Sequence, residues 1–442
     1  MRHFVVLGLF CYVAVFGQTA SLLRSGPMNG YATHRAVMLW IQTIGPASVQ
    51  IAYRWEQHPI DSLRYTPPVK TSADNDFIAH IHIPYLEPGR RYVYDVLING
   101  QKVHLPYQPT FHTQHLWQWR TDPPEFAVAL GSCFYVNDPP YDRPGKAYGD
   151  SFQILSAITR QQPDLMIWLG DNVYLREADF GDPQMLSYRY AHTRGHPLLQ
   201  ALLATTHHYA VWDDHDYGPN DADRSYHLKE TALRIFRNYW ANPSYGLPNL
   251  PGVFTQFSWG DVDFFLLDDR YYRSPNRIPD SDSDKTMWGG AQLSWLLDAL
   301  TYSKAPFKVV INGNQFLNAS TRYESLAAHF PAEFKYLIRE IRRRDIRGVV
   351  FISGDRHHTE LIRYQPDNRY PFYELTVSPL TSRYASRPEK NPRRMKGTLV
   401  RQRNFAILRF SGPRQNRQMT ITVYDVRGMP LWQHTISASE LR

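Results

Sequence analysis

Four apolar runs in the chain each end in aspartate, histidine or cysteine residues, and this repeated arrangement limits the folds that fit. The runs and the residues that follow them are 126–130 with Gly131-Ser132-Cys133, 165–169 with Gly170-Asp171, 207–212 with Asp213-Asp214-His215-Asp216, and 349–353 with Gly354-Asp355-Arg356-His357-His358. Short apolar runs of this kind are typical of buried β-strands. Open α/β sheets place functional residues at the carboxyl ends of their strands. The sequence therefore predicts one polynuclear metal centre, of the kind that hydrolyses phosphoesters.

The composition permits large cores and favours an anionic ligand. The chain has 442 residues, of which 43% are hydrophobic and 14% aromatic. The formal net charge of +8 favours an anionic substrate or surface. The charge is not accompanied by a helix-turn-helix, zinc-finger or RNA-binding pattern, so specific nucleic-acid recognition is not expected. A small phosphate ester is the expected partner, and a membrane surface is the weaker alternative.

The N-terminus is typical of a secretory signal peptide. Residues 1–16 run from a basic start into an apolar stretch, and Gly17 or Ala20 could lie at the cleavage site. The stretch is short for a membrane span, so an uncleaved anchor is the alternative interpretation. We expect a signal peptide at 1–20 and a secreted or periplasmic protein.

The chain has two cysteines, Cys11 and Cys133. Removal of the signal would leave Cys133 as a lone thiol with no internal disulfide partner. A lone thiol in an oxidising compartment is a liability unless it is buried or ligated. A buried core cysteine is the plain interpretation, but its position at a strand end favours ligation.

Two regions with different patterns divide the rest of the chain. Residues 21–115 contain short alternating runs separated by turns, which predict a β-sandwich. The pattern Leu86-x-Pro88-Gly89-x-x-Tyr92-x-Tyr94 resembles a fibronectin type III-like domain. Residues 116–124 are expected to be a linker. Residues 125–442 alternate strands with helices and predict an α/β sandwich with mixed sheets.

Periodicity predicts helices and strands within the second region. Helices are expected at 151–161, 184–204, 227–240, 291–300 and 332–344. Strands are expected near 126–131, 164–169, 207–212, 254–258, 262–268, 307–312, 348–353, 373–377, 404–410 and 419–424. The basic segment 383–403 is expected to be a mobile surface loop or, alternatively, part of the substrate rim.

The ordered motifs resemble those of the alkaline phosphatase D (PhoD-like) metallophosphatases. The motifs are Gly131-Ser132-Cys133, Gly170-Asp171-x-x-Tyr174, Trp212-Asp213-Asp214-His215-Asp216 and Gly354-Asp355-Arg356-His357. Members of this family carry a β-sandwich before the catalytic domain, so the resemblance covers nearly the whole chain. It implies a dinuclear or trinuclear centre of Fe³⁺ and Ca²⁺, with other divalent metals as the alternative. Many members have a twin-arginine signal, and its absence here puts the metal identity in question.

The resemblance also implies a role for each residue. Iron would be held by Cys133, Asp171, Tyr174 and His357. Asp171 would bridge to calcium, which Asp355 and an oxygen ligand from 214–220 would complete, with Asp214 preferred over Asp213 and with Asn220 or Asp221 as a further ligand. Independently of the resemblance, thiolate, phenolate and imidazole suit a transition metal and oxygen ligands suit calcium.

Two residues are expected to act on the substrate. His215 is the natural group to protonate the leaving group or to hold the phosphate. Arg270 follows another apolar run and could clamp a phosphate with two hydrogen bonds, although an ordinary salt bridge is equally compatible with the sequence.

The resulting interpretation is an exported hydrolase of phosphomonoesters, phosphodiesters or both, acting through a metal-activated hydroxide. One alternative is a phosphodiesterase for phospholipids or nucleotides. A second alternative, from a different class, is a surface binding protein that has no catalytic activity.

Overall fold

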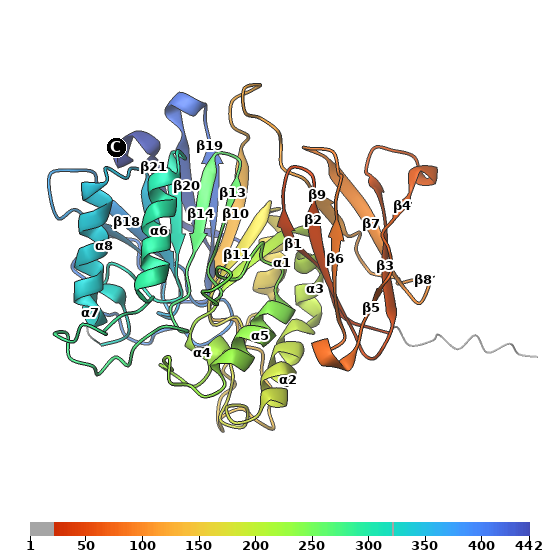
Figure 1. Ribbon diagram of the computed structural model, residues 1–442, viewed down its shortest axis with the longest axis horizontal. Coiled ribbons are helices and arrows are strands. Elements are labelled where there is room, and N and C mark those ends of the chain that lie inside the picture. Colours follow the sequence, from red (N-terminus) through yellow and green to blue (C-terminus); the bar gives the residue numbers. More distant parts are fainter. Residues whose placement is uncertain (1–21, 321) are drawn as a thin grey trace, which may run out of the picture.

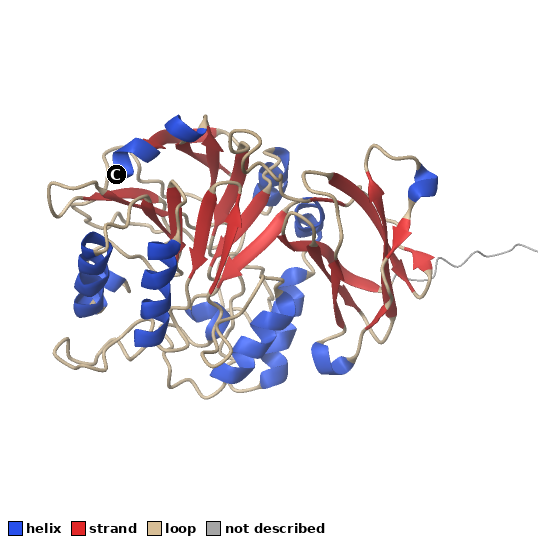
Figure 2. Ribbon diagram, turned by 45° about the horizontal axis from the view of Figure 1, so that its top comes forward, coloured by secondary structure: helices blue, strands red, loops and turns tan. Residues whose placement is uncertain are grey.

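The computed structural model describes residues 22–320 and 322–442, which form three β-sheets. Figure 1 shows two sheets at the centre of the molecule and a β-sandwich at one end. Figure 2 shows that the helices gather in separate groups outside the sheets. The predicted architecture is therefore confirmed: an α/β sandwich with mixed sheets follows an all-β sandwich.

The largest sheet has nine strands and carries three of the four predicted strand ends. In sheet order its strands are β21 (Pro430–Ser437), β20 (Gln418–Asp425), β19 (Asn404–Ser411), β10 (Phe126–Gly131), β11 (Leu165–Leu169), β12 (His207–Val211), β1 (Leu23–Ala32), β2 (Val37–Thr43) and β6 (Ile78–Ile83). Strands β10, β11 and β12 are parallel neighbours. Their carboxyl ends therefore lie along one edge, as the sequence predicts.

The second sheet has six strands and carries the fourth predicted strand end. In sheet order its strands are β13 (Thr255–Trp259), β14 (Val262–Leu266), β15 (Phe307–Ile311), β16 (Val349–Ser353), β18 (Phe372–Thr376) and β17 (Glu360–Tyr364). Strands β14, β15, β16 and β18 are parallel, and the two edge strands are antiparallel to their neighbours.

Alternating side chains pack the nine-stranded sheet on both faces. Phe126, Val128 and Leu130 of β10 join the core cluster that the six-stranded sheet also lines. Ala127 and Ala129 face the other way, into a second cluster built with helices. Both faces of β10 are thus apolar, which explains why its sequence reads as a continuous hydrophobic run.

The described residues include eight α-helices. They are α1 (Gln153–Arg160), α2 (Pro183–Arg194), α3 (Gln200–Thr205), α4 (Asp214–Tyr217), α5 (Lys229–Tyr239), α6 (Gly290–Tyr302), α7 (Leu326–His329) and α8 (Pro331–Arg343). The single helix expected at 184–204 is wrong, because α2 ends before Gly195 and a new turn begins at Pro197. Proline has no amide proton to continue a helix, and it suits the first turn of the next one.

The N-terminal region shares a sheet with the rest of the chain. Its second sheet consists of β3 (Ser48–Trp55), β4 (Arg64–Tyr65), β5 (Val69–Lys70), β7 (Arg91–Ile98), β8 (Gln101–Lys102) and β9 (Thr110–His112). Its other sheet is β1-β2-β6, which continues directly from β12 because β1 pairs with that strand in parallel. The division into 21–115, 116–124 and 125–442 stays a proposal about folding units.

Buried contacts seal this junction. His207 of β12 bonds the carbonyl of Gly30 through Nδ1 at 2.8 Å, and its Nε2 accepts from the backbone of His112 at 3.3 Å. A Cβ added to Gly30 would lie 2.3 Å from that of Ala241, so β1 closely approaches the segment that follows α5. The two regions therefore pack without a flexible gap.

The described residues include no helix that is both long and apolar enough to cross a membrane. The expected signal peptide at 1–20 lies outside the described residues.

Candidate metal centre

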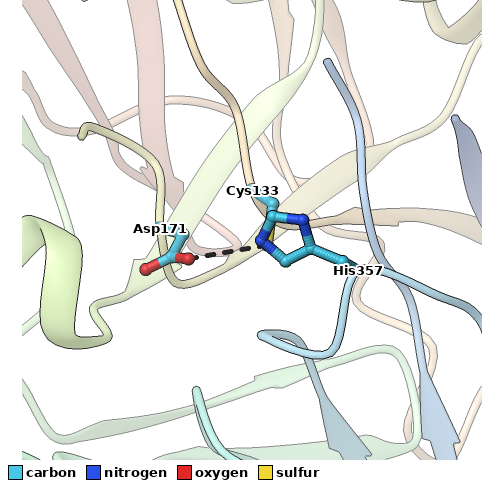
Figure 3. Close-up of side chains that lie close together, drawn as sticks. All are labelled: Cys133, Asp171 and His357. Carbon is cyan, nitrogen blue, oxygen red and sulfur yellow. Dashed lines mark hydrogen bonds between the residues drawn. The ribbon is translucent and has the colours of Figure 1, made fainter. Parts of the chain in front are cut away.

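The four predicted strand ends converge on one point of the molecule. Three overlapping groups of side chains have ligand atoms within 4.8 Å of one another. The groups are Cys133 with Asp171 and His357, Asp171 with Asp214 and His215, and Asp214 with Asp221 and Glu324. Figure 3 shows Asp171 and His357 on either side of Cys133, each delivered by a different loop. Asp171 and Asp214 are shared between groups, so the arrangement suits adjacent ions.

The first group has the ligand chemistry of a transition metal. The Sγ atom of Cys133 lies 3.6 Å from Oδ2 of Asp171. The hydroxyl of Tyr174 donates to the same oxygen at 3.0 Å and lies 3.4 Å from Nε2 of His357. The Nδ1 atom of His357 bonds the carbonyl oxygen of Arg383, which leaves Nε2 free for a metal.

Strained backbone accompanies these ligands. Cys133, Asp171, Asp355 and His357 have φ values of 56°, 52°, 66° and 55°, all in the left-handed region. Residues with a Cβ rarely adopt this conformation, and such strain collects at functional sites. The strained turns bring side chains from the strand ends to one place.

The second group contains one of the two aspartates that follow β12. This aspartate, and not its neighbour, points into a cavity above the ligand groups. Asp214 lines it and accepts backbone hydrogen bonds from His215 and Asp221, both at 2.8 Å. Asp213 is fully buried and instead binds the guanidinium of Arg270 and the amide of Asn314. The preference for Asp214 as a ligand thus agrees with the direction of the two side chains.

The third group includes Glu324, a residue that the sequence pattern does not indicate. Glu324 lies in the loop between β15 and α7, where no strand-end motif marks it. It accepts from Arg270 at 2.6 Å and from Arg273 at 2.7 Å. Asn220 and Asp355, which the sequence predicts as ligands, line the same cavity.

The electrostatics of the cluster fit a bound cation. Burial raises the pKa of Cys133 to about 11, although the hydrogen bond from Ser378 opposes this shift. Burial and the neighbouring charges of Cys133 and Asp214 also raise the pKa of Asp171 well above its usual range. Burial raises the pKa of Asp355 to about 7 although Arg356 opposes it. Buried anions this close favour a compensating cation, and thiolate, carboxylate and imidazole are its usual ligands.

His215 lies between the two ligand groups. Its backbone amide donates to Asp171, its ring lies 4.5 Å from that of Tyr174, and its Nδ1 is buried without a partner among the described residues. Burial lowers the pKa of His215, although the charge of Asp214 opposes this shift. This position allows His215 to serve either as a proton-transfer group or as a ligand.

The expected phosphate clamp at Arg270 does not fit the structure. Arg270 is fully buried, and its guanidinium nitrogens bind Asp213, Glu324 and the carbonyl of Ala222. It does not line the cavity. Its role is to hold two carboxylates in place, which is the salt-bridge alternative.

A cavity of about 560 Å³ opens above the ligand groups. Four arginines line it, namely Arg322, Arg356, Arg383 and Arg387. Arg356 pairs with Glu389 and stacks 4.4 Å from the ring of Tyr323. A larger hollow of about 710 Å³ lies at the opposite ends of the strands and contains none of the ligand residues. The chemistry, and not the size, identifies the site.

The basic segment 383–403 contributes to this rim. Residues 383–387 and Glu389 line the cavity, and Arg394 pairs with the buried Glu360 of β17. Thr359 and Val400 exchange backbone hydrogen bonds. The alternative expectation, that the segment forms part of the rim, therefore agrees with its position.

The family follows from the sequence match over the same region. Residues 132–420 match the family model of PhoD-like phosphatases, which covers more than half of the chain. The chain belongs to the PhoD-like phosphatase family. In this PhoD-like chain, residues 20–116 match a separate domain of unknown function. The resemblance predicted from the four motifs is confirmed.

Known relatives of the PhoD-like chain agree with the fold. Alkaline phosphatase D of Bacillus subtilis (strain 168) is 23% identical, over 75% of this chain and 64% of its own length. The chain thus spans less than two thirds of that relative. The solved structure of PhoD superposes with a TM-score of 0.75 at 17% identity, covering 95% of this chain and 90% of the other. Purple acid phosphatase PPD1 from yellow lupin gives 0.65 at 11% identity, covering 93% and 74%.

Proposed function

We propose that this PhoD-like chain is an exported, metal-dependent phosphohydrolase that cleaves phosphomonoesters, phosphodiesters or both. The observation that carries the proposal is that one cavity has metal-binding side chains at its floor and arginines at its rim. The floor holds the overlapping groups of metal-binding side chains, and the rim of the same cavity holds four arginines. Cations on the floor and guanidinium groups on the rim attract a phosphate from two sides.

The ligand roles follow the chemistry of each group. We assign iron to Cys133, Asp171, Tyr174 and His357, and calcium to Asp171, Asp214, Asn220 and Asp355. When bound, the metals would polarise phosphoryl oxygens and lower the pKa of water. Arg383 and Arg387, which are exposed and line the cavity, would bind the non-reacting phosphate oxygens in place of Arg270. His215 would donate a proton to the leaving oxygen.

The decisive experiment measures metals and turnover on the same sample. The purified protein is analysed for iron, calcium and zinc and assayed with a chromogenic phosphomonoester and a matched diester. We expect two metals and hydrolysis of at least one ester, both abolished together by chelation. Metal-loaded protein that hydrolyses neither ester would support the alternative of a binding protein.

Hydrolysis of the diester alone would favour a phosphodiesterase. Assays with a phospholipid and a dinucleotide would then separate the two diester classes. Export is tested separately by the N-terminal sequence of the mature protein, which should begin near residue 21.

A further inference from the structure

Ser378 lies behind the proposed iron ligands and touches two of them. It is fully buried and follows β18 by two positions. Its Oγ lies 3.1 Å from Sγ of Cys133 and accepts the backbone amide of His357 at 3.0 Å. A serine hydroxyl has one proton to donate. Because His357 supplies the other contact as a donor, that proton is available to the sulfur.

A neighbouring serine shows that the contact is selective. The Oγ of Ser132 is also near the sulfur, at 3.5 Å, but it donates to the carbonyl of Val377 at 2.8 Å. Its single proton is therefore committed to an oxygen acceptor. Ser378 is therefore the serine whose hydroxyl donates a hydrogen bond to the sulfur of Cys133.

The position of Ser378 is fixed from both sides. Its backbone amide donates to Oγ1 of Thr359 at 3.1 Å, and its carbonyl accepts from the side-chain amide of Asn404 at 2.9 Å. Thr359 in turn donates to Asn404 at 2.6 Å. These contacts come from the β17 and β19 sides of the site and hold the backbone of Ser378 in place next to Cys133.

We propose that Ser378 is a positioning residue that donates a hydrogen bond to the Cys133 thiolate and anchors the His357 loop. The inference rests on the metal-binding role of Cys133 in the proposed function. A hydrogen bond withdraws electron density from a thiolate and so tunes its bond to the metal. Partners of this kind change metal affinity or activity by about 10- to 100-fold when they are removed.

Cobalt gives a test that does not depend on turnover or on the native metal. The full-length protein, stripped of metal and loaded with Co²⁺, should show a thiolate-to-cobalt charge-transfer band. Ser378→Ala should move this band to longer wavelength and weaken Co²⁺ binding about 10- to 100-fold. Ser378→Thr should restore both. Ser132→Ala is the matched control, and it should leave the band in place.

An unchanged band in folded Ser378→Ala would overturn the inference, as would an equal shift in Ser132→Ala. If Ser378→Ala does not fold, the isosteric pair Ser378→Thr and Ser378→Val isolates the hydroxyl, and equal bands in that pair would also overturn it. Absence of any thiolate band in the unmodified protein would remove its basis. A shifted band in a protein that hydrolyses no ester would support the inference and contradict the proposed function instead.

Discussion

Asp171 contacts more of the metal site than its size would suggest. Its Oδ2 faces Cys133 and Tyr174, while its Oδ1 receives the amide of His215. It belongs to two of the three ligand groups. A carboxylate in this position can neutralise two ions at once, which is how a bridging ligand acts.

Asp171→Asn should therefore lose both metals and all turnover. The fold should persist, because a neutral amide is easier to bury than a carboxylate whose pKa is raised by burial. Metal analysis and a thermal melt of the same sample check this. Asp345→Asn, which alters an exposed aspartate paired with Arg347, is the control. A variant that kept both metals would show that Asp171 does not bridge.

A substitution at Tyr174 tests the proposed identity of the first metal. A phenolate bound to ferric iron produces a visible charge-transfer band, so the purified protein should be coloured. Tyr174→Phe should bleach or shift the band and lower activity. Tyr135→Phe removes the hydroxyl of an adjacent ring, 5.0 Å away, that bonds Asp142 instead, and it should leave the band intact. A colourless, fully active protein containing only zinc would contradict the iron assignment.

A substitution at His215 distinguishes a role in proton transfer from a role in metal binding. His215→Ala should retain its metals and lose rate by about 10²- to 10⁴-fold, the usual contribution of a positioned acid or base. Metal content and kcat measured together distinguish the outcomes. Loss of metal in this variant would make His215 a ligand and leave the proton donor unassigned.

Some of the site residues could be grouped from the sequence alone, and others could not. Parallel strands deliver their ends to one edge, so the sequence alone is enough to group Cys133, Asp171 and Asp214. Glu324 sits in a loop without a periodic pattern, and nothing in the sequence marks it. Ser378 directly follows the strand expected near 373–377, but the sequence does not show that its hydroxyl lies against Cys133. Arg270 follows an apolar run like the ligands do, but burial beside Asp213 commits it to a carboxylate, and only three-dimensional packing reveals that.

Strand β12 buries two adjacent histidines that should make the fold sensitive to acid. His208 accepts from Trp168 and bonds the carbonyl of Leu202, and His207 bonds Gly30. Burial is the main reason that the pKa of each falls from 6.5 to about 3. Below pH 6.5 the unfolded chain binds protons that these folded histidines do not, so their contribution to stability is lost as the pH falls.

His208→Gln should therefore flatten the pH dependence of unfolding between about pH 6 and 4, by up to about 1.4 kcal/mol per pH unit. Buried acids with raised pKa values, such as Asp216 at about 7, act in the opposite direction. The difference between variant and parent isolates the histidine. Urea unfolding at several pH values measures it, with the exposed His82→Gln as control. Parallel curves for parent and variant would contradict the prediction.

Helices and strands with a strong hydrophobic periodicity could be predicted from the sequence. Strands that contain glycine and proline residues could not. The expected strands near 126–131 and 307–312 match β10 and β15. The first strand, β1, contains Gly26, Pro27 and Gly30, which read as turn residues. Its place in the sheet depends on partners far away in the sequence, because Gly30 fits against Ala241 only without a Cβ.

The nine-stranded sheet includes β1, β2 and β6, so removal of the N-terminal region should change the catalytic region as well. All proposed ligands follow residue 121, so a chain starting at Thr121 keeps the metal site. It also loses β1 and exposes β12 as an unpaired edge, which promotes aggregation.

We expect this shortened protein to bind metals and cleave a small chromogenic ester, but to be less stable and to self-associate. Size-exclusion chromatography, metal analysis and an ester assay check these points. A soluble, folded, metal-loaded protein that cleaved no small ester would show that the N-terminal region supplies catalytic groups. The proposed division of labour would then be wrong.

The pairing of β1 with β12 also has a consequence for biosynthesis. The contact between Gly30 and His207 joins positions 177 residues apart. During synthesis the first strand emerges long before its partner, and contacts of such separation slow folding. We expect β1 to pair with β2 soon after both have emerged, while its other edge stays open until β12 leaves the ribosome.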